Sequence, residues 1–113
     1  MKKIKPDSIT TFLGADTHIE GIIKFQGTIR LDGKINGKIF GDNGTVIVGE
    51  KAIIHAEIDV DSAVILGEVH GTIRAKGNIK VHPPGKVIGD IYSPVLSIDS
   101  GAVFHGNCVM DKK

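Results

Sequence analysis

Three histidines occupy the same position in a recurring short pattern, one residue before a glycine or an alanine. They are His55, His70 and His105. If successive copies of the pattern stack, His55 and His70 lie about 5 Å apart, the spacing of neighbouring strands. Two stacked imidazoles could contribute to a zinc site, but zinc usually takes three or four protein ligands. Ile88 interrupts the row before His105, so we interpret the row as part of a solvated outer face and predict no metal site.

The other groups with chemical potential have structural explanations. Cys108 is the single cysteine and falls at an apolar position of the pattern, which predicts a small core residue rather than a nucleophile. The segment Gly41-Asp42-Asn43-Gly44 is better explained as a turn than as a phosphate cradle, because no helix follows it. No Ser-His-Asp set and no pair of catalytic carboxylates can be assembled. We therefore expect neither enzyme activity nor a cofactor.

The composition favours strands as the elements that position these groups. A chain of 113 residues is long enough for one compact domain. Its apolar residues include 18 Ile and 10 Val against four Leu and six Ala, and β-branched side chains pack well on a pleated sheet. Fifteen glycines, spread along the chain, leave few windows that could sustain a helix. An all-β fold is expected.

Charge and hydropathy exclude further classes of protein. Five lysines lie within the first five and last two residues, which leaves nine basic and 13 acidic residues from position 7 to 111. A slightly acidic body is a poor platform for nucleic acid. The longest apolar runs are three or four residues, too short for a transmembrane span or a signal peptide. We expect a cytoplasmic location.

The short pattern forms an internal repeat that spans the chain. Each copy has two apolar residues four positions apart with a small residue between them, and the small residues recur at an average interval of 17. They stand at positions 21, 37, 56, 71, 89 and 106. A second alternating element separates the copies: Thr10-Thr11-Phe12, Ile29-Arg30-Leu31, Val46-Ile47-Val48, Val64-Ile65-Leu66, Ile79-Lys80-Val81 and Leu96-Ser97-Ile98.

Seventeen residues fit one winding of a parallel β-helix with three short sides and three tight corners. The preference of parallel crossovers favours a right-handed coil. We predict a right-handed, three-sided parallel β-helix of about six windings over residues 12–110. A flexible basic tail over 1–11 and a short tail over 111–113 flank it. Equivalent side chains stack in rows, here called ladders. Two inward ladders are expected, one of Ile19, Ile35, Ile54, Val69, Val87 and Phe104 and one of Ile23, Ile39, Ile58, Ile73, Ile91 and Cys108.

The first and last windings of such a coil expose unpaired backbone groups and the apolar stack behind them, and open strand edges recruit further strands. The tails offer little to cover these ends, so end-to-end association by strand addition is expected, giving a filament where the joint does not close. A monomer whose tails fold over both ends is the alternative. The expected interface comprises Phe12, Leu13, Ile19, Ile23, Leu96, Ile98, Phe104, Cys108 and Met110.

The amino-acid sequence of the repeat resembles that of the bactofilins, a family of bacterial cytoskeletal proteins. The resemblance covers roughly residues 12–110 and lies in three segments: Phe12-Leu13-Gly14-Ala15-Asp16-Thr17 with Ile19-Glu20-Gly21, then Gly27-Thr28-Ile29-Arg30-Leu31-Asp32-Gly33, then Gly101-Ala102-Val103-Phe104-His105-Gly106-Asn107-Cys108. It implies a right-handed three-sided β-helix that polymerises through its terminal windings without nucleotide, with Phe104 as the aromatic residue of the junction.

The resemblance also implies a cellular role and partners. Family members act as scaffolds in cell shape, wall synthesis, polarity or appendage placement, and several recruit cell-wall enzymes. Several reach the membrane through a short N-terminal segment, which here corresponds to Met1, Lys2, Lys3, Ile4 and Lys5. Each lysine near an anionic inner leaflet contributes about 1 kcal/mol. The expected partners are thus further copies of the chain, the inner membrane surface, and cell-wall enzymes or other envelope proteins.

One alternative from another functional class is a left-handed β-helix enzyme of the hexapeptide-repeat type, such as an acyltransferase or a γ-class carbonic anhydrase. Val48, Ile54, Val60 and Leu66 do stand six residues apart. The register then fails at Thr72, and repeats of 15 to 19 residues do not preserve hexads. The sequence therefore favours a structural protein.

Overall fold

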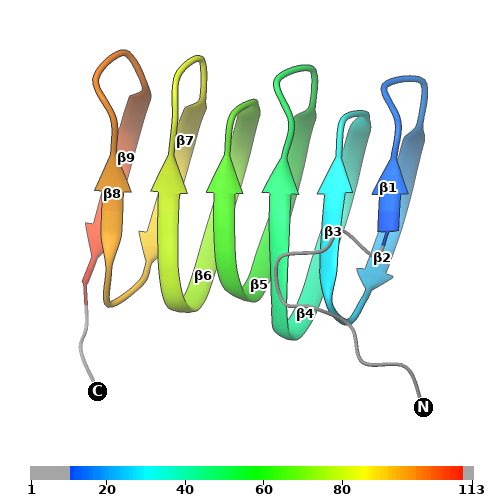
Figure 1. Ribbon diagram of the computed structural model, residues 1–113, viewed down its shortest axis with the longest axis horizontal. Coiled ribbons are helices and arrows are strands. Elements are labelled where there is room, and N and C mark those ends of the chain that lie inside the picture. The colour runs from blue at the N-terminus through cyan, green and yellow to red at the C-terminus, as the bar shows by residue number, and fades with distance from the viewer. Residues whose placement is uncertain (1–10, 111–113) are drawn as a thin grey trace.

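The computed structural model describes residues 11–110, which form a single parallel sheet wound into a coil (Figure 1). The described residues contain strands, turns and bends and no helix. The strands are β1 (Thr11–Leu13), β2 (His18–Lys24), β3 (Thr28–Leu31), β4 (Lys34–Val48), β5 (Ile53–Ile65), β6 (Glu68–Val81), β7 (Lys86–Tyr92), β8 (Leu96–Ile98) and β9 (Val103–Val109). Thr11, assigned above to the N-terminal tail, is the first residue of β1. The remainder of both predicted tails lies outside the described residues.

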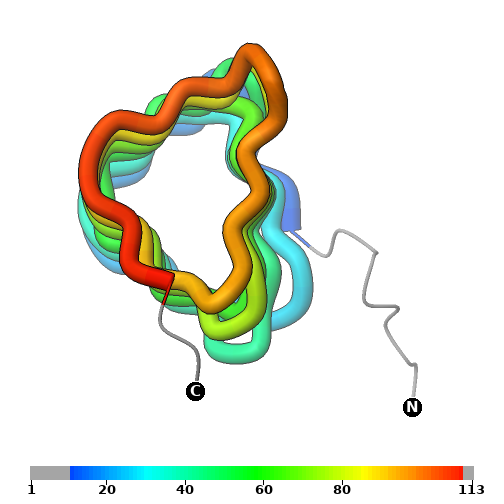
Figure 2. Tube along the Cα trace, turned by 90° about the vertical axis from the view of Figure 1, so that its left-hand side faces the viewer, coloured from blue at the N-terminus to red at the C-terminus, as the bar shows by residue number. Residues whose placement is uncertain are grey.

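Every strand pairing is parallel and joins one winding to the next, as a β-solenoid requires. About six windings stack along the long axis, and Figure 2 shows their three-sided outline. The C-terminal end faces the viewer in Figure 2, and the trace runs anticlockwise as it approaches, which is the sense of a right-handed coil. The predicted solenoid architecture is confirmed.

The core is formed by the inward ladders. The register stacks Ile35 on Ile54 and Ile39 on Ile58, and the same phase continues through the following windings. In the four middle windings these side chains are fully buried, as are those of Leu31 and Ile65 on the third side of the coil. Burial of each aliphatic side chain contributes roughly 1.5–3 kcal/mol. Both predicted ladders have the composition expected from the sequence.

The third side differs from the prediction in two windings. Ala63-Val64-Ile65 stacks on Val46-Ile47-Val48, so the element lies one residue before the predicted Val64-Ile65-Leu66. In the first winding Thr11-Phe12-Leu13, rather than Thr10-Thr11-Phe12, stacks on β3. The physical reason is that residues 63–66 are all apolar, so alternation does not fix which of them point inward.

The small residue of the repeat lies at a bend between two sides of the coil. Gly21, Gly37, Gly71, Gly89 and Gly106 all have φ between 136° and 144°, a conformation that L side chains rarely adopt. From the second winding onward a Cβ atom at these glycines would also collide with the backbone of the glycine or alanine stacked beneath it. Both conformation and close approach therefore require a small residue.

The corners that join the third side of the coil to the first alternate in length through the first five windings, and the last two are both long. Four-residue corners, closed by a hydrogen bond from the fourth amide to the first carbonyl, occur at 14–17, 49–52, 82–85 and 99–102. The intervening windings turn with only Asp32-Gly33 and Leu66-Gly67 between strands. The long corners project as loops at the top of Figure 1, with the short corners recessed between them.

Candidate assembly surfaces at the two ends of the solenoid

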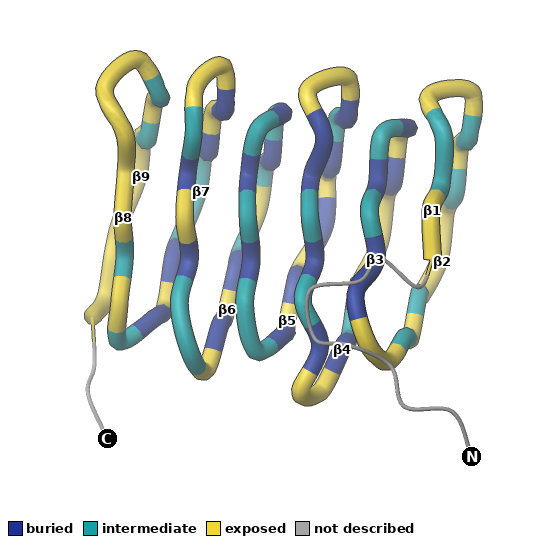
Figure 3. The backbone as a smooth tube through the Cα atoms, viewed as in Figure 1, coloured by how far each residue is buried: buried dark blue, intermediate teal, exposed yellow. Residues whose placement is uncertain are grey.

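The N-terminal end of the coil exposes one edge of both of its strands. β1 pairs only with β3 and β2 only with β4, so within residues 11–110 their outer edges have no strand partner. The inward side chains Leu13, Ile19 and Ile23 pack against the core but are only half-buried. Figure 3 shows this loss of burial at both ends of the coil. The predicted interface residues Leu13, Ile19 and Ile23 therefore lie on an open end face.

The C-terminal end repeats this arrangement. β8 pairs only with β6 and β9 only with β7. Leu96 and Phe104 are half-buried against the core, and Ile98 is exposed. These three predicted residues share the ladders that are buried one winding earlier. The end face is thus a cross-section through the apolar core.

Cys108 shows the effect of the missing winding directly. It stacks on Ile91, which is fully buried, yet Cys108 itself is exposed. Cys108 therefore lies on the predicted inward ladder, but the prediction that it is a buried core residue is wrong. It is exposed because no further winding within the described residues covers it.

Two predicted interface residues lie beside the end faces rather than on them. Phe12 stacks on Arg30 in an outward ladder and is 60% exposed, so it lies on the side wall of the first winding. Met110 follows β9 and is 54% exposed. The membrane-contact prediction, Met1 to Lys5, lies outside the described residues.

Sequence reasoning missed several apolar side chains near the ends. Phe25 packs on the core in the turn between β2 and β3, and Val95, Val103 and Val109 are exposed in the last winding. Val103 and Val109 stand at outward positions that hold Lys86 and Tyr92 one winding earlier. The sequence did contain a signal for these residues, namely apolar residues at outward positions of a terminal winding.

The histidine row is confirmed as two stacked side chains on an outward face. The rings of His55 and His70 lie 4.5 Å apart and nearly parallel. His70 also contacts the carboxylate of Glu68, and this hydrogen bond lowers the pKa of Glu68. Among residues 11–110 no group of three or more His, Cys, Asp or Glu side chains is placed to hold a metal ion.

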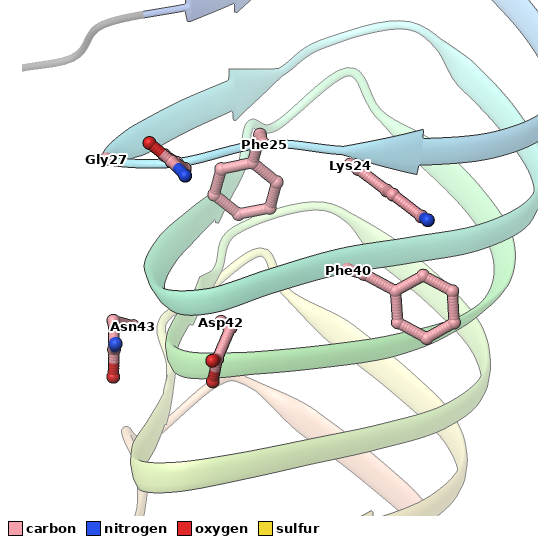
Figure 4. Close-up of a pocket in the computed structure, with 7 residues that line it drawn as sticks. Lys24, Phe25, Gly27, Phe40, Asp42 and Asn43 are labelled. Atoms are coloured by element: carbon pink, nitrogen blue, oxygen red, sulfur yellow. The ribbon is translucent and has the colours of Figure 1, made fainter.

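The segment Gly41–Gly44 is a corner, as predicted. The pairing of β4 with β5 shifts register across it, and Asn43 has a φ of 62°. The ring of Phe25 lies so close to Gly41 and Gly44 that a Cβ atom at either glycine would overlap it. Figure 4 shows the shallow hollow at this corner, between Phe25 and Phe40.

Comparisons with known proteins agree with this geometry. The family model "Bactofilin: Polymer-forming cytoskeletal" matches residues 11–109. Bactofilin BacO of Myxococcus xanthus (strain DK1622) is 31% identical over 103 residues, which cover 91% of this chain and 81% of BacO. Bactofilin BacP of the same organism is 28% identical over 100 residues, 88% of this chain but only 41% of BacP.

A solved structure shares the fold. The solid-state NMR structure of the cytoskeletal bactofilin BacA matches with a TM-score of 0.76 at 28% identity, covering 90% of this chain and 96% of BacA. The described residues contain no helix long and apolar enough to cross a membrane. Bactofilins are structural cytoskeletal proteins, so the hexapeptide-repeat enzyme considered from the sequence is excluded. A six-winding β-solenoid that matches the family model over nearly its whole length belongs to the bactofilin family of polymer-forming cytoskeletal proteins.

Proposed function

We propose that the protein polymerises end to end through its terminal windings, without nucleotide, into filaments that serve as an intracellular scaffold. The observation that carries this proposal is the pair of open end faces, where the inward ladders stop half-buried beside unpaired strand edges. Stacking of one end on another would extend the ladders and pair the free backbone groups at once. A chain with two such ends forms an open polymer when the contacts do not close into a ring.

The residues of the proposed junction are the predicted inward residues of the two ends. At the N-terminal end they are Leu13, Ile19 and Ile23, and at the C-terminal end Leu96, Ile98, Phe104 and Cys108. Phe12 and Met110 border the two end faces and belong to the proposed interface as its rim. Burial of apolar surface stabilises the junction by about 25 cal/mol per Å².

The test uses paired variants in each terminal strand. Phe104→Arg places a charge on the C-terminal end face, and His105→Arg places the same charge on the adjacent outward position. Ile23→Arg and Ile22→Arg form the equivalent pair in β2, because Ile22 points outward and is 63% exposed. Negative-stain electron microscopy without nucleotide should show filaments for the wild type and the two outward variants. The two inward variants should remain small.

The outcome that contradicts the proposal is equally clear. A folded wild-type protein that sediments as one subunit per particle at all concentrations would overturn it, as would filaments that persist in both inward variants. Circular dichroism and thermal unfolding of each variant distinguish a blocked junction from a failure to fold.

The proposal extends to the membrane through Met1, Lys2, Lys3, Ile4 and Lys5. Each lysine near an anionic leaflet contributes about 1 kcal/mol, too little for one chain but sufficient when a filament presents many copies. The filament should float with vesicles that contain anionic lipid. Replacement of Lys2, Lys3 and Lys5 by glutamate should abolish flotation and leave filaments intact. Flotation that is unchanged by these substitutions would exclude the N-terminal segment as the contact.

The proposed cellular role is the organisation of cell-shape or cell-wall machinery, with cell-wall enzymes or other envelope proteins as partners. Support for this role comes from the family alone. Deletion should displace sites of wall synthesis, and a copy carrying Phe104→Arg should fail to restore them. Restoration by that variant would separate the cellular role from polymerisation.

A further inference from the structure

Four of the five histidines of the chain lie on the outer face of the first side of the coil, the side that precedes the small residue in each winding. They are His18, His55, His70 and His105. The other ionisable residues of this face are two lysines and two glutamates, whose formal charges cancel: Lys34, Lys86, Glu20 and Glu68. The net charge of this face therefore depends on how many of its histidines carry a proton.

One hollow on this face collects nitrogen donors. It measures about 450 Å³ and is lined by His18, Lys34, Asn36, Ile53 and His55 from the first three windings. Four of these five side chains can donate a hydrogen bond from nitrogen, none is an acid, and Ile53 is half-buried in the wall. A partly apolar wall with a few polar groups, around a volume of about 300–1,000 Å³, is typical of sites for small ligands.

Most of these donors have no partner among residues 11–110. Lys34 takes part in no ion pair there, and neither the Asn36 amide nor the ring nitrogens of His55 take part in a hydrogen bond. The His55 ring is held by its stack on the next histidine of the row, with the ring centroids 4.5 Å apart. His18 Nε2 lies 3.7 Å from the Glu20 carboxylate, beyond the ordinary length of a hydrogen bond. The donors of the hollow are thus available to a ligand.

We propose that this hollow binds a phosphate group, held by Lys34 and Asn36 at its centre and by His18 and His55 on either side. The two histidines lie two windings apart, about 9.6 Å at the ordinary strand spacing, with Lys34 and Asn36 in the winding between them. An ammonium group has no lone pair and repels a metal ion, so these donors suit an anion. With both histidines protonated, three positive charges surround the hollow. They match a phosphate monoester, whose charge is about −1.5 to −2 at pH 7, better than a singly charged carboxylate.

Protonation of His18 and His55 should set the affinity. Histidine ordinarily gains its proton between about pH 8 and pH 5, so the positive charge of the hollow rises over this range. The ionisable groups around the two rings come from four strands: Glu20 in β2, Lys34 in β4, Glu68 and His70 in β6, and Lys86 in β7. The glutamates attract the protonated rings, whereas the lysines and a protonated His70 repel them, and a bound phosphate offsets this repulsion. One phosphate per chain should therefore bind about tenfold more tightly at pH 6.5 than at pH 8.5.

Equilibrium dialysis with inorganic phosphate measures this binding in filaments and in single subunits alike, so its result does not depend on the proposed polymerisation. Lys34→Gln should weaken binding at pH 6.5 about tenfold, because it removes the permanent positive charge of the hollow. Lys86→Gln is the matched control, since Lys86 is exposed on the same ladder three windings further along. It should leave the affinity nearly unchanged.

Two further variants separate a phosphate site from a general effect of charge or folding. Glu20→Gln removes the carboxylate beside His18, so it should tighten phosphate binding, which a variant that merely damages the fold would not do. His18→Gln combined with His55→Gln should retain weak binding through Lys34. That binding should no longer tighten as the pH falls from 8.5 to 6.5.

A flotation assay distinguishes a phosphate on a lipid headgroup from a phosphate in solution. The chain used carries glutamate in place of Lys2, Lys3 and Lys5, which removes the proposed N-terminal contact. Flotation with phosphatidylcholine vesicles that contain phosphatidic acid, lost in Lys34→Gln, would identify a lipid headgroup as the ligand. Binding of inorganic phosphate without flotation would identify a soluble phosphate ester.

Absence of saturable phosphate binding at pH 6.5 would overturn the inference. Equal binding by Lys34→Gln and the wild type would also overturn it, as would equal losses in Lys34→Gln and Lys86→Gln or weaker binding by Glu20→Gln. None of these results bears on polymerisation, and a wild type that forms no filaments would contradict the proposed function while leaving the phosphate site intact.

Discussion

The carbonyl oxygen of Gly21 lies 1.8 Å from the point that a Cβ atom on Gly37 would occupy. The two glycines stack in successive windings, and each has a φ of 136°. At Gly21 the same hypothetical Cβ atom meets nothing within 4 Å, because no described winding lies beneath it. Gly21 and Gly37 therefore share one backbone conformation, but only at Gly37 would a Cβ atom collide with the winding stacked against it.

This difference predicts unequal effects of the same substitution. Gly21→Ala adds only the strain of an alanine held at a φ of 136°, roughly 1–3 kcal/mol. Gly37→Ala adds a collision with the backbone of the first winding and should lower the free energy of unfolding by clearly more. Urea unfolding of both variants in the Phe104→Arg background, expected to be monomeric, measures the difference. Equal destabilisation would show that the conformation alone requires glycine.

Ala56 shows why the sequence could predict a small residue at this position of the repeat but could not predict the physical reason for it. Ala56 stands in the glycine ladder, stacked between Gly37 and Gly71, without their positive φ. A small side chain at a fixed interval is visible in the sequence, whereas φ and the stacking distance depend on how the windings meet. The repeat thus predicted the position of the bend and left its geometry open.

The same limit applies to register and burial. The inward ladders of Ile35 and Ile39 were predicted correctly because polar residues alternate with them. Alternation fails at Ala63-Val64-Ile65-Leu66, where four apolar residues follow one another, and there the prediction was off by one. The exposure of Cys108 depends on its place in the last winding rather than on its own neighbours in the sequence. The sequence predicted tight corners between the sides, but the grouping of long and short corners along one edge required the wound coil.

The contact between Glu68 and His70 predicts a pH dependence of stability. The hydrogen bond from His70 lowers the pKa of Glu68 below its ordinary value of 4.5, with added attraction from Lys86. A carboxylate with a lowered folded pKa contributes stability above its unfolded pKa and loses it as the pH falls through the folded value. Glu68→Gln should therefore reduce the melting temperature at pH 6, and its difference from wild type should be smaller at a pH below the lowered pKa of Glu68. The effect is small, because exposed pairs contribute about 0.2–1 kcal/mol.

Glu57→Gln is the matched control for the pH experiment. Glu57 is an exposed carboxylate in β5, the strand that pairs with β6, in which Glu68 lies. The melting temperature of Glu57→Gln should follow the wild type at both pH values. A difference between Glu68→Gln and wild type that persists unchanged at low pH would mean that the carboxylate acts through packing rather than through its charge.

The thiol of Cys108 reports directly on the proposed junction. It is exposed in the single chain and lies on the ladder that ends at the C-terminal face. Polymerisation through that face should bury it, so a maleimide should react many times more slowly with filaments than with Phe104→Arg subunits. A cysteine introduced at the outward neighbour, Asn107→Cys in a Cys108→Ser background, should react equally fast in filaments and in subunits. Fast alkylation of Cys108 in intact filaments would place the junction elsewhere and leave the C-terminal winding as a free end.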